Sequence, residues 1–277
     1  MKFGKIKNWI LVGGEDIVLD TAKFLISKNQ KIKIYTGERN LKARLKNGKT
    51  LKQNFIASKI SFKFNKDINK NLLIDSSDAS ETLILSLSSP WIFKKSTINK
   101  FSNRIINLHE ADLPLNRGGA TISWMIMMNT KKSASALHLI TTVIDGGDIL
   151  MKKRYTFPKK LEIPNDYAKY IFLQSKLLIR NFIKGVCANQ SFLLEKNDKS
   201  NSTYWPRLNT ELQSYINWNW NIYDIYKFIK SFDDPYNGSR SFINNKQIII
   251  KKVKVLKAKS KFHPFQNGVV YKKFNKK

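Results

Sequence analysis

Asn107 and His109 are the pair of side chains best suited to chemistry in this chain. They lie two positions apart in the apolar segment 105–109, which we expect to be a β-strand with His109 at its carboxyl end. Because side chains alternate between the faces of a strand, both project from the same face. An amide can donate hydrogen bonds to an oxygen that gains negative charge, and an imidazole can accept or relay a proton near neutral pH. A polar turn at 143–148 follows another strand-like stretch, and we expect a parallel sheet to bring this turn alongside His109.

The elements that would position these groups follow the order of a parallel α/β sheet. Residues 9–12 are apolar and end in Gly13-Gly14, residues 17–28 have helical periodicity, and residues 31–35 alternate as a strand does. This order is typical of a Rossmann-like, mostly parallel sheet flanked by helices. Gly13-Gly14 lacks the three-glycine dinucleotide fingerprint, and no acidic residue ends the second strand. We therefore interpret these glycines as a tight turn.

The remaining elements predict one large domain and a small C-terminal one. We expect further strands at residues 72–75, 82–87, 134–140 and 149–155, and helices at residues 92–101, 122–128, 165–186 and 223–232. The helix at 165–186 would have Asn165 as its N-terminal cap. A hairpin with its turn at Asn244-Asn245 is expected between residues 242 and 256. These patterns predict an α/β domain at 1–200 and a small α+β domain at 201–277.

The composition leaves two explanations open for the formal net charge of +30. Only eight of the 50 basic residues are Arg, whereas Lys is abundant throughout the chain. Because Arg is the residue suited to bidentate recognition of phosphates, this excess of Lys is typical of a compositional bias with a general attraction for anionic substrates. The alternative is a polyanionic partner such as tRNA, since residues 246–277 contain eleven Lys and no acidic residue.

The chain has a single cysteine, Cys187, and therefore gives no sign of an oxidising compartment. No apolar run reaches the ~18 residues of a membrane span, and the N-terminal run is too short for a signal peptide. We expect a cytoplasmic protein without a membrane partner. The three histidines, at positions 109, 138 and 263, lack metal-ligand spacing, so we expect no metal.

The segment Asn107-Leu-His-Glu-Ala-Asp-Leu-Pro-Leu-Asn-Arg-Gly-Gly, with Ile144-Asp-Gly-Gly-Asp-Ile about 36 residues after its histidine, resembles the folate-dependent formyltransferases. This family includes the glycinamide ribonucleotide, methionyl-tRNA and sugar N-formyltransferases. Its catalytic Asn, His and Asp fall on Asn107, His109 and Asp145. The resemblance is best over residues 86–157. At 111–114 the chain has Ala-Asp-Leu-Pro where many members have Ser-Leu-Leu-Pro, which puts substrate contacts of that loop in doubt.

The resemblance implies metal-free transfer of a formyl group from 10-formyltetrahydrofolate, the cosubstrate, to an amine. The amine attacks the formyl carbon, and the resulting oxyanion needs donors such as the Asn107 amide and a His109 N–H. Asp145 would orient His109 or hold a water that shuttles the proton, and the division of proton transfer between them stays open. Arg117 either touches substrate or is a structural arginine. The residues that match the family's folate pocket, each of which could instead be ordinary packing, are Trp91, Ile92, Phe93, Ile105, Thr141, Thr142 and Val143.

The C-terminal segments favour a nucleotide-linked amino sugar as the acceptor. Tyr204-Trp-Pro-Arg and Phe232-Asp-Asp-Pro-Tyr-Asn-Gly are similar to the sugar enzymes, and 263–268 resembles the start of a small β-domain that would be shortened here. The alternative acceptor is methionyl-tRNA, which the basic segment 39–52 and the Lys-rich tail would suit. Glycinamide ribonucleotide formylation and a non-catalytic folate- or polyanion-binding homologue are the remaining interpretations. A homodimer is one option for the assembly.

Overall fold

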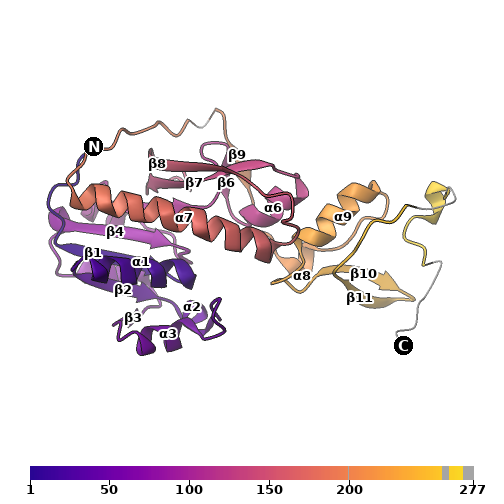
Figure 1. Cartoon of the computed structure of the whole chain (residues 1–277), viewed down its shortest axis with the longest axis horizontal. Coiled ribbons are helices and arrows are strands. Elements are labelled where there is room, and N and C mark those ends of the chain that lie inside the picture. Colours follow the sequence, from indigo (N-terminus) through magenta and orange to yellow (C-terminus); the bar gives the residue numbers. More distant parts are fainter. Residues whose placement is uncertain (199, 258–261, 271–277) are drawn as a thin grey trace. The chain divides into compact units, whose positions relative to one another are not determined.

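The computed structural model describes residues 1–198, 200–257 and 262–270 (Figure 1). Two compact units are present, and neither is continuous along the chain. The first unit comprises Met1–Gly118, Lys132–Phe157 and Lys169–Trp205. The second comprises Gly119–Lys131, Pro158–Ala168 and the chain from Pro206 onward. The boundary near residue 205 lies close to the division at residue 200 that the sequence suggests, but two earlier segments join the second unit.

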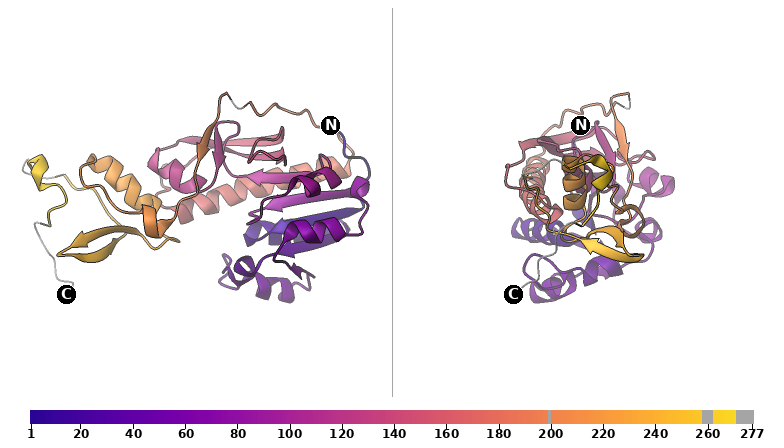
Figure 2. Two further views of the ribbon diagram at one scale, coloured as in Figure 1. Left: turned by 180° about the vertical axis from the view of Figure 1, so that it is seen from behind. Right: turned by 90° about the vertical axis from the view of Figure 1, so that its right-hand side faces the viewer.

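A seven-stranded sheet with the order β3-β2-β1-β4-β5-β7-β8 forms the centre of the first unit (Figure 2). The first five strands in this order pair in parallel, and the last two are antiparallel to their neighbours. The mostly parallel Rossmann-like sheet predicted from the sequence is therefore confirmed. The strands are β1 (Asn8–Gly13), β2 (Ile32–Thr36), β3 (Lys63–Phe64), β4 (Thr82–Leu87), β5 (Ile105–His109), β7 (Lys132–Leu139) and β8 (Ile149–Thr156). β6 (Asn116–Gly118) pairs separately with β9 (Thr203–Trp205).

Helices pack on both faces of this sheet because its strands are apolar on both sides. On one face, α1 (Glu15–Ser27), α3 (Leu51–Ala57) and the later turns of α7 (Pro164–Cys187) share a core with Leu85, Ile106 and Leu108. On the other face, α4 (Ile68–Ile74) and α5 (Lys95–Lys100) pack with Ile84 and Ile105. Since Ile106 and Leu108 point to the first face, Asn107 and His109 point to the second. The short α2 (Glu38–Lys42) and the 3₁₀ turn η1 (Ala79–Glu81) lie in connections.

The predicted strand at residues 72–75 is wrong, because most of this segment is the last turn of α4. Asp67 caps this helix by accepting hydrogen bonds from the backbone N–H groups of Asn69 and Lys70, and Leu72 is fully buried on its inner side. A short apolar run cannot be assigned to helix or strand by periodicity alone, and here the cap decides. Helix α5 begins later than expected. Helix α7 begins at Pro164 rather than after an Asn165 cap, because proline suits the first helical position.

The second unit has the α+β character that the sequence predicts. α6 (Thr121–Met127) packs against α9 (Ile222–Ser231), and the Ser123 hydroxyl donates a 2.9 Å hydrogen bond to the carbonyl of Ser231. β10 (Ser239–Ile243) and β11 (Lys246–Ile250) form the expected hairpin, which ends earlier than residue 256. Asn244 and Asn245 form its turn with φ of 47° and 59°, the left-handed values that a tight two-residue turn requires. The remaining elements are α8 (Thr210–Gln213) and η2 (Pro264–Gln266).

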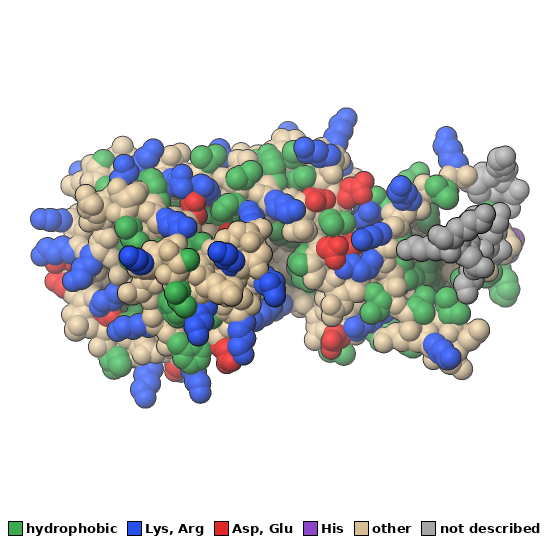
Figure 3. All heavy atoms as spheres, turned by 60° about the horizontal axis from the view of Figure 1, so that its bottom comes forward, with side chains coloured by type: hydrophobic (Ala, Val, Ile, Leu, Met, Phe, Trp, Pro, Cys, Tyr) green, Lys and Arg blue, Asp and Glu red, His purple; other side chains and the backbone are tan. Residues whose placement is uncertain are grey.

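Within the described part of the chain, no helix combines the length and the apolar character needed to span a membrane. Lys and Arg side chains are spread widely over the face seen in Figure 3, with a few Asp and Glu side chains among them. The charge therefore does not gather into a single stripe on that face.

Candidate functional site

The candidate site is built on one row of residues that crosses three neighbouring strands. Ser86 on β4 pairs with Asn107 on β5, and Asn107 pairs with His138 on β7. Residues paired across strands project to the same face of a sheet, so these three side chains lie next to one another. His109, two positions beyond Asn107, projects from the same face at the carboxyl end of β5.

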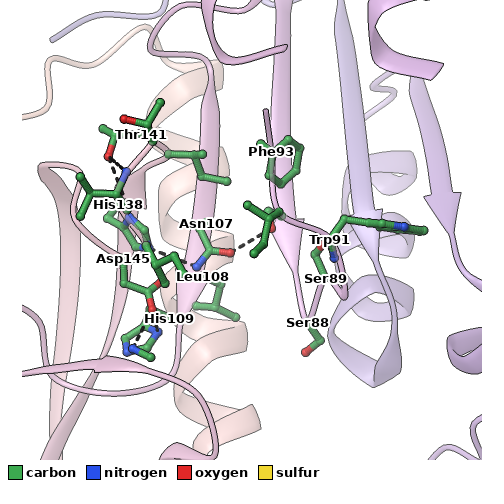
Figure 4. Close-up of a pocket in the computed structure, with 17 residues that line it drawn as sticks. Ser88, Ser89, Trp91, Phe93, Asn107, Leu108, His109, His138, Thr141 and Asp145 are labelled. Atoms are coloured by element: carbon green, nitrogen blue, oxygen red, sulfur yellow. Dashed lines mark hydrogen bonds and ion pairs between the residues drawn. The ribbon is translucent and has the colours of Figure 1, made fainter. Parts of the chain in front are cut away.

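A chain of hydrogen bonds follows this row (Figure 4). The Ser86 hydroxyl donates to Asn107 Oδ1 over 2.9 Å. Asn107 Nδ2 lies 3.1 Å from His138 Nε2, and His138 Nδ1 lies 2.9 Å from the carbonyl oxygen of Leu139. Ser86 and His138 are both about 2% exposed. The Asn107 amide is therefore held between two buried side chains, while Asn107 itself is partly exposed to the cavity.

Asp145 reaches the two histidines from the loop that joins β7 to β8. Its Oδ2 lies 3.5 Å from His109 Nδ1, and its Oδ1 lies 3.4 Å from His138 Nε2. The backbone N–H of Gly118 donates to Oδ2 over 2.9 Å, which fixes the carboxylate. The site thus brings together the three groups that the sequence singled out: an amide, an imidazole and a carboxylate.

The strand that precedes the Asp145 loop runs in the direction opposite to the one we expected. β7 is antiparallel to β5 rather than parallel. The carboxyl end of β7 lies beside the start of β5, so the loop must fold back toward His109. Asp145 has a left-handed φ of 47°, which helps this reversal. A Cβ atom at Gly147 would lie 1.9 Å from the Leu139 carbonyl oxygen, so only glycine allows the close approach of the two backbone segments.

Arg117 contacts Asn197, which holds the Asp145 loop. Arg117 is not among the residues that line the site cavity. Its Nη2 donates to the backbone carbonyl (3.0 Å) and to Oδ1 (2.8 Å) of Asn197. Asn197 in turn donates from Nδ2 to the carbonyl oxygens of Asp145 and Gly147. Arg117 is only 5% exposed, so of the two interpretations of this residue the structural one describes the arrangement.

Burial and close contacts set the charges of the two groups at the centre of the site. Burial lowers the pKa of His109 from its ordinary value of 6.5, while Asp145 and the Asn116 carbonyl act in the opposite direction. His109 Nε2 lies 2.6 Å from that carbonyl oxygen, so a neutral imidazole carries its hydrogen on Nε2 and leaves Nδ1 unprotonated. Burial alone would raise the pKa of Asp145, but the Gly118 N–H and the attraction of a protonated His138 or His109 lower it.

A cavity of about 280 Å³ opens over these residues. Six of the seven predicted folate-pocket residues line it, namely Trp91, Ile92, Phe93, Thr141, Thr142 and Val143. Ile105 does not, because it is buried in the core beside Phe101. In Figure 4 Trp91 and Phe93 lie on one side of Asn107, and His138 and Asp145 lie on the other. The lining also contains residues that the sequence did not single out: Ser86, Ser88, Ser89, Leu108, Gly118, His138, Ile140 and Ile144.

His138 is the main residue that sequence reasoning missed. It lies in an apolar strand between Leu137 and Leu139, where a lone histidine reads as core. The signal that could have found it is the alternation of β7, which puts His138 on the face opposite to those two leucines. Its antiparallel register with Asn107, however, cannot be read from the sequence. No group of three or more His, Cys, Asp or Glu side chains suited to a metal ion occurs among the described residues.

Comparisons with known proteins show which family the chain resembles. A family model described as formyl transferase matches residues 23–180, and one described as the formyl transferase C-terminal domain matches residues 210–276. The methionyl-tRNA formyltransferase of Rickettsia africae is 26% identical over 188 residues, which are 68% of this chain and 59% of that protein. The matched regions span about half to three fifths of such curated relatives. Because the first model covers more than half of the sequence, the chain belongs to the formyl transferase family.

Solved structures share the fold at low sequence identity. The sugar 3-N-formyltransferase WlaRD, crystallised in the presence of dTDP and 5-N-formyl-THF, has a TM-score of 0.70 and 21% identity. It covers 88% of this chain and 85% of its own. The N-formyltransferase of Helicobacter canadensis, in complex with folinic acid and dTDP-3-aminofucose, has a TM-score of 0.69 and 19% identity. The match covers 88% and 86% of the two chains.

Proposed function

We propose that this protein transfers a formyl group from 10-formyltetrahydrofolate to a primary amine carried by a nucleotide-linked amino sugar. The observation that carries the proposal is the convergence of Asn107, His109 and Asp145 on one cavity, with all three among its lining residues. The amide is a donor, the neutral imidazole has an unprotonated Nδ1, and the carboxylate lies 3.5 Å from that atom. These are the groups that acyl transfer to nitrogen requires.

The reaction would use each group at a definite atom. The amine attacks the formyl carbon, a C–N bond forms, and the formyl oxygen gains a negative charge that an Asn107 N–H would stabilise. His109 Nδ1 would take the proton that the amine loses, and the resulting imidazolium would face the Asp145 carboxylate. When the bond to N10 of the folate breaks, the same proton would pass to N10. The products are the formamide and tetrahydrofolate.

The cavity suits the pterin end of a folate better than the whole molecule. Its volume of about 280 Å³ lies at the lower end of the range for ligand pockets, which is ~300–1,000 Å³. Trp91, Phe93 and Ile140 supply apolar walls for a flat ring, and Ser89 and Thr141 add hydroxyl groups at the edge. Support for the choice of cosubstrate comes from the two sugar enzymes of similar fold, one solved in the presence of 5-N-formyl-THF and the other in complex with folinic acid.

The choice of acceptor rests on the same two structures, whose nucleotide ligands are dTDP and dTDP-3-aminofucose. Methionyl-tRNA is the second candidate, because curated relatives with that activity match the chain and because residues 39–52, from α2 to the start of α3, form a basic segment. That segment contains Arg39, Lys42, Arg44, Lys46, Lys49 and Lys52. Its charge would suit RNA phosphates but carries no information about the amine.

An acceptor assay tests the proposal directly. Purified protein with 10-formyltetrahydrofolate is mixed with a panel of dTDP- and UDP-linked amino sugars or with charged methionyl-tRNA, and release of tetrahydrofolate is followed. We expect turnover with at least one amino-sugar nucleotide and none with the tRNA. Formylation of methionyl-tRNA alone would replace the acceptor, and no transfer to any amine in the panel would overturn the proposal.

Single substitutions connect this assay to the site. His109→Ala and Asn107→Ala should each lower turnover by roughly 10²–10³-fold, the usual effect of removing a donor or proton-transfer group. The matched control is His263→Ala, which removes an exposed histidine at the start of η2. Unchanged melting temperatures would show that the variants are folded. Full activity of His109→Ala would remove that residue from the mechanism.

A further inference from the structure

His138 has no part in the reaction described above, yet it contacts two of the three groups at the centre of the site. Its ring is 2% exposed, and its Nε2 lies within 3.4 Å of both Asn107 Nδ2 and Asp145 Oδ1. The His109 ring lies 6.4 Å away, centroid to centroid. His109 and Asp145 are thus the titratable groups close to it. At Nε2 the Asn107 amide nitrogen needs an acceptor and the Asp145 carboxylate needs a donor, so the shorter contacts of the ring decide its tautomer.

The two shortest contacts of the His138 ring, 2.9 Å at Nδ1 and 3.1 Å at Nε2, define this tautomer, and Asp145 Oδ1 lies farther from Nε2 at 3.4 Å. A carbonyl oxygen can only accept, so the 2.9 Å contact with Leu139 O requires a hydrogen on Nδ1. In the neutral ring Nε2 then carries a lone pair, and it accepts from Asn107 Nδ2 at 3.1 Å. Asn107 Oδ1 is already occupied as the acceptor of the Ser86 hydroxyl at 2.9 Å. Every donor in this chain of three hydrogen bonds meets an acceptor, with the amide nitrogen on the His138 side.

From this arrangement we infer that His138 is a positioning residue, which holds the Asn107 amide with its nitrogen toward His109 and Asp145. The inference rests on the proposed formyl transfer. An amide nitrogen has two hydrogens, and one is used by His138. The second remains for the formyl oxygen, on the side of the cavity where the base lies. Donor and base then act on the same face of the reacting carbon.

The opposite amide orientation would misplace the donor. A second proton on His138 would put an N–H against Asn107 Nδ2, and the amide would have to turn its oxygen toward the imidazolium. The nitrogen would then face Ser86, on the far side of the side chain from Asp145. Loss of the imidazole has a related effect, because nothing would distinguish the two ends of the amide. His138 therefore acts through Asn107 and does not touch the reacting atoms.

The tautomer can be measured without any turnover. The chain contains three histidines, so protein labelled with 15N in histidine gives few ring signals, and His138→Leu identifies the set that belongs to position 138. We expect a neutral ring with a protonated Nδ1 and an unprotonated Nε2 in the folded protein at neutral pH. A ring protonated on Nε2, either alone or together with Nδ1, would overturn the inference.

Kinetics then test whether the ring acts through Asn107. His138→Leu should lower kcat by roughly 10–100-fold, which is at most the effect of removing a hydrogen-bond donor itself. KM for the acceptor should change little. His138→Gln should recover much of this loss, since its Oε1 can accept from Asn107 while its N–H faces Asp145. In an Asn107→Ala background, His138→Leu should cause no further loss of kcat. His263→Leu is the matched control for removal of a histidine.

The outcomes separate the two proposals. If the unmodified protein fails to transfer formyl groups, the proposed function fails, and the NMR result still decides the tautomer. If the unmodified protein is active but His138→Leu retains full kcat, the positioning role is wrong. Equal losses in His138→Leu and His138→Gln, or additive losses with Asn107→Ala, would also contradict it. A lower melting temperature with unchanged kcat would leave His138 as a core residue only.

Discussion

Glu110 follows the catalytic candidate His109 and has an unusual environment for a carboxyl group. It accepts a 3.1 Å hydrogen bond from the Ser175 hydroxyl on α7, and Ser175 contacts Ser135 over 2.8 Å. Burial and the nearby Glu15 carboxylate raise the pKa of Glu110 from its ordinary value of 4.5 to about 7. The folded protein therefore retains a proton on this group at a pH where the unfolded chain has lost it.

This shift predicts a pH-dependent stability effect. Because the folded state binds more protons than the unfolded state between pH 4.5 and about 7, the contribution of Glu110 is fully present below that range and is lost as pH rises through it. Glu110→Gln removes the cost of ionisation while keeping an acceptor for Ser175. We expect the substitution to raise the melting temperature by a few degrees at pH 8 and to have little effect at pH 5.

The control for this measurement is Glu211→Gln, which neutralises an exposed carboxyl group on α8. Its melting temperature should follow that of the unmodified protein at both pH values. A Glu110→Gln variant that is equally destabilised at pH 5 and pH 8 would contradict the prediction, because a lost packing contact has no such pH dependence.

At the scale of elements, Asp75 connects β2 to the chain that follows α4. Its two carboxylate oxygens lie 2.9 Å from Lys33 Nζ, and Oδ2 accepts a 2.8 Å hydrogen bond from the Tyr35 hydroxyl. Burial would raise the pKa of Asp75, but the hydrogen bonds from Ser77, Lys33 and Tyr35 hold it well below its ordinary range. The Asp75 carboxylate therefore pairs with the polar ends of two side chains, Lys33 and Tyr35, that lie two positions apart on β2.

Removing this carboxylate should be costly. Asp75→Ala leaves the buried Tyr35 hydroxyl and the partly buried Lys33 ammonium without their acceptor, and we expect a loss of roughly 2–3 kcal/mol in the free energy of unfolding. Urea unfolding followed by circular dichroism measures it. Glu38→Ala provides the contrast, because its ion pair with Lys42 is exposed on both sides and screened by solvent, so its loss should have little effect on the free energy of unfolding. Equal effects of the two substitutions would show that the Asp75 contacts are not stabilising.

The sequence could predict some parts of the site and not others, for physical reasons. Asn107 and His109 were predictable as a pair because alternation along a single strand is a local property. The approach of Asp145 was predicted with the wrong strand direction, because the sense of β7 depends on the connection that precedes it. The contact between Arg117 and Asn197 joins residues 80 positions apart, which no local pattern reveals. His138 was missed because its importance lies in its register with β5.

The fold was predictable to a similar extent. Long periodic segments such as α1 and α7, and the buried strands β1, β4 and β5, follow their sequence patterns closely. The error at α4 arose where a short apolar run was compatible with both helix and strand, and a polar cap outside the run decided the outcome. The order of the expected elements indicated a small C-terminal unit. It could not show that residues 119–131 and 158–168 also belong to that unit.

At the scale of the whole molecule, the net charge of +30 should bind nucleic acid without specificity. We expect the dissociation constant for an arbitrary tRNA to rise steeply with salt, by orders of magnitude between about 50 and 200 mM, because many phosphates release counterions. KM for an amino-sugar nucleotide should rise far less, because only two phosphates are involved. A salt titration of RNA binding by fluorescence anisotropy, together with KM measured over the same range, tests both expectations.

One outcome of the RNA-binding titration would count against a generic charge effect. Binding that prefers initiator methionyl-tRNA over other tRNAs at high salt would indicate readout beyond phosphate contacts. That result would favour the second acceptor. Parallel salt dependence of RNA binding and of KM would instead suggest that the nucleotide sugar is also held mainly by long-range charge.

The interleaving of the two units along the chain determines how hybrid enzymes would have to be assembled. A gene fused at residue 205 would retain α6, whose Met125 is fully buried, while exchanging the α9 segment against which α6 packs. In such a chimera, α6 would come from one protein and the α9 segment that packs against it from another. Exchange of the second unit between relatives therefore requires three separate segments to be transplanted together, and libraries with a single crossover should contain few well-folded clones.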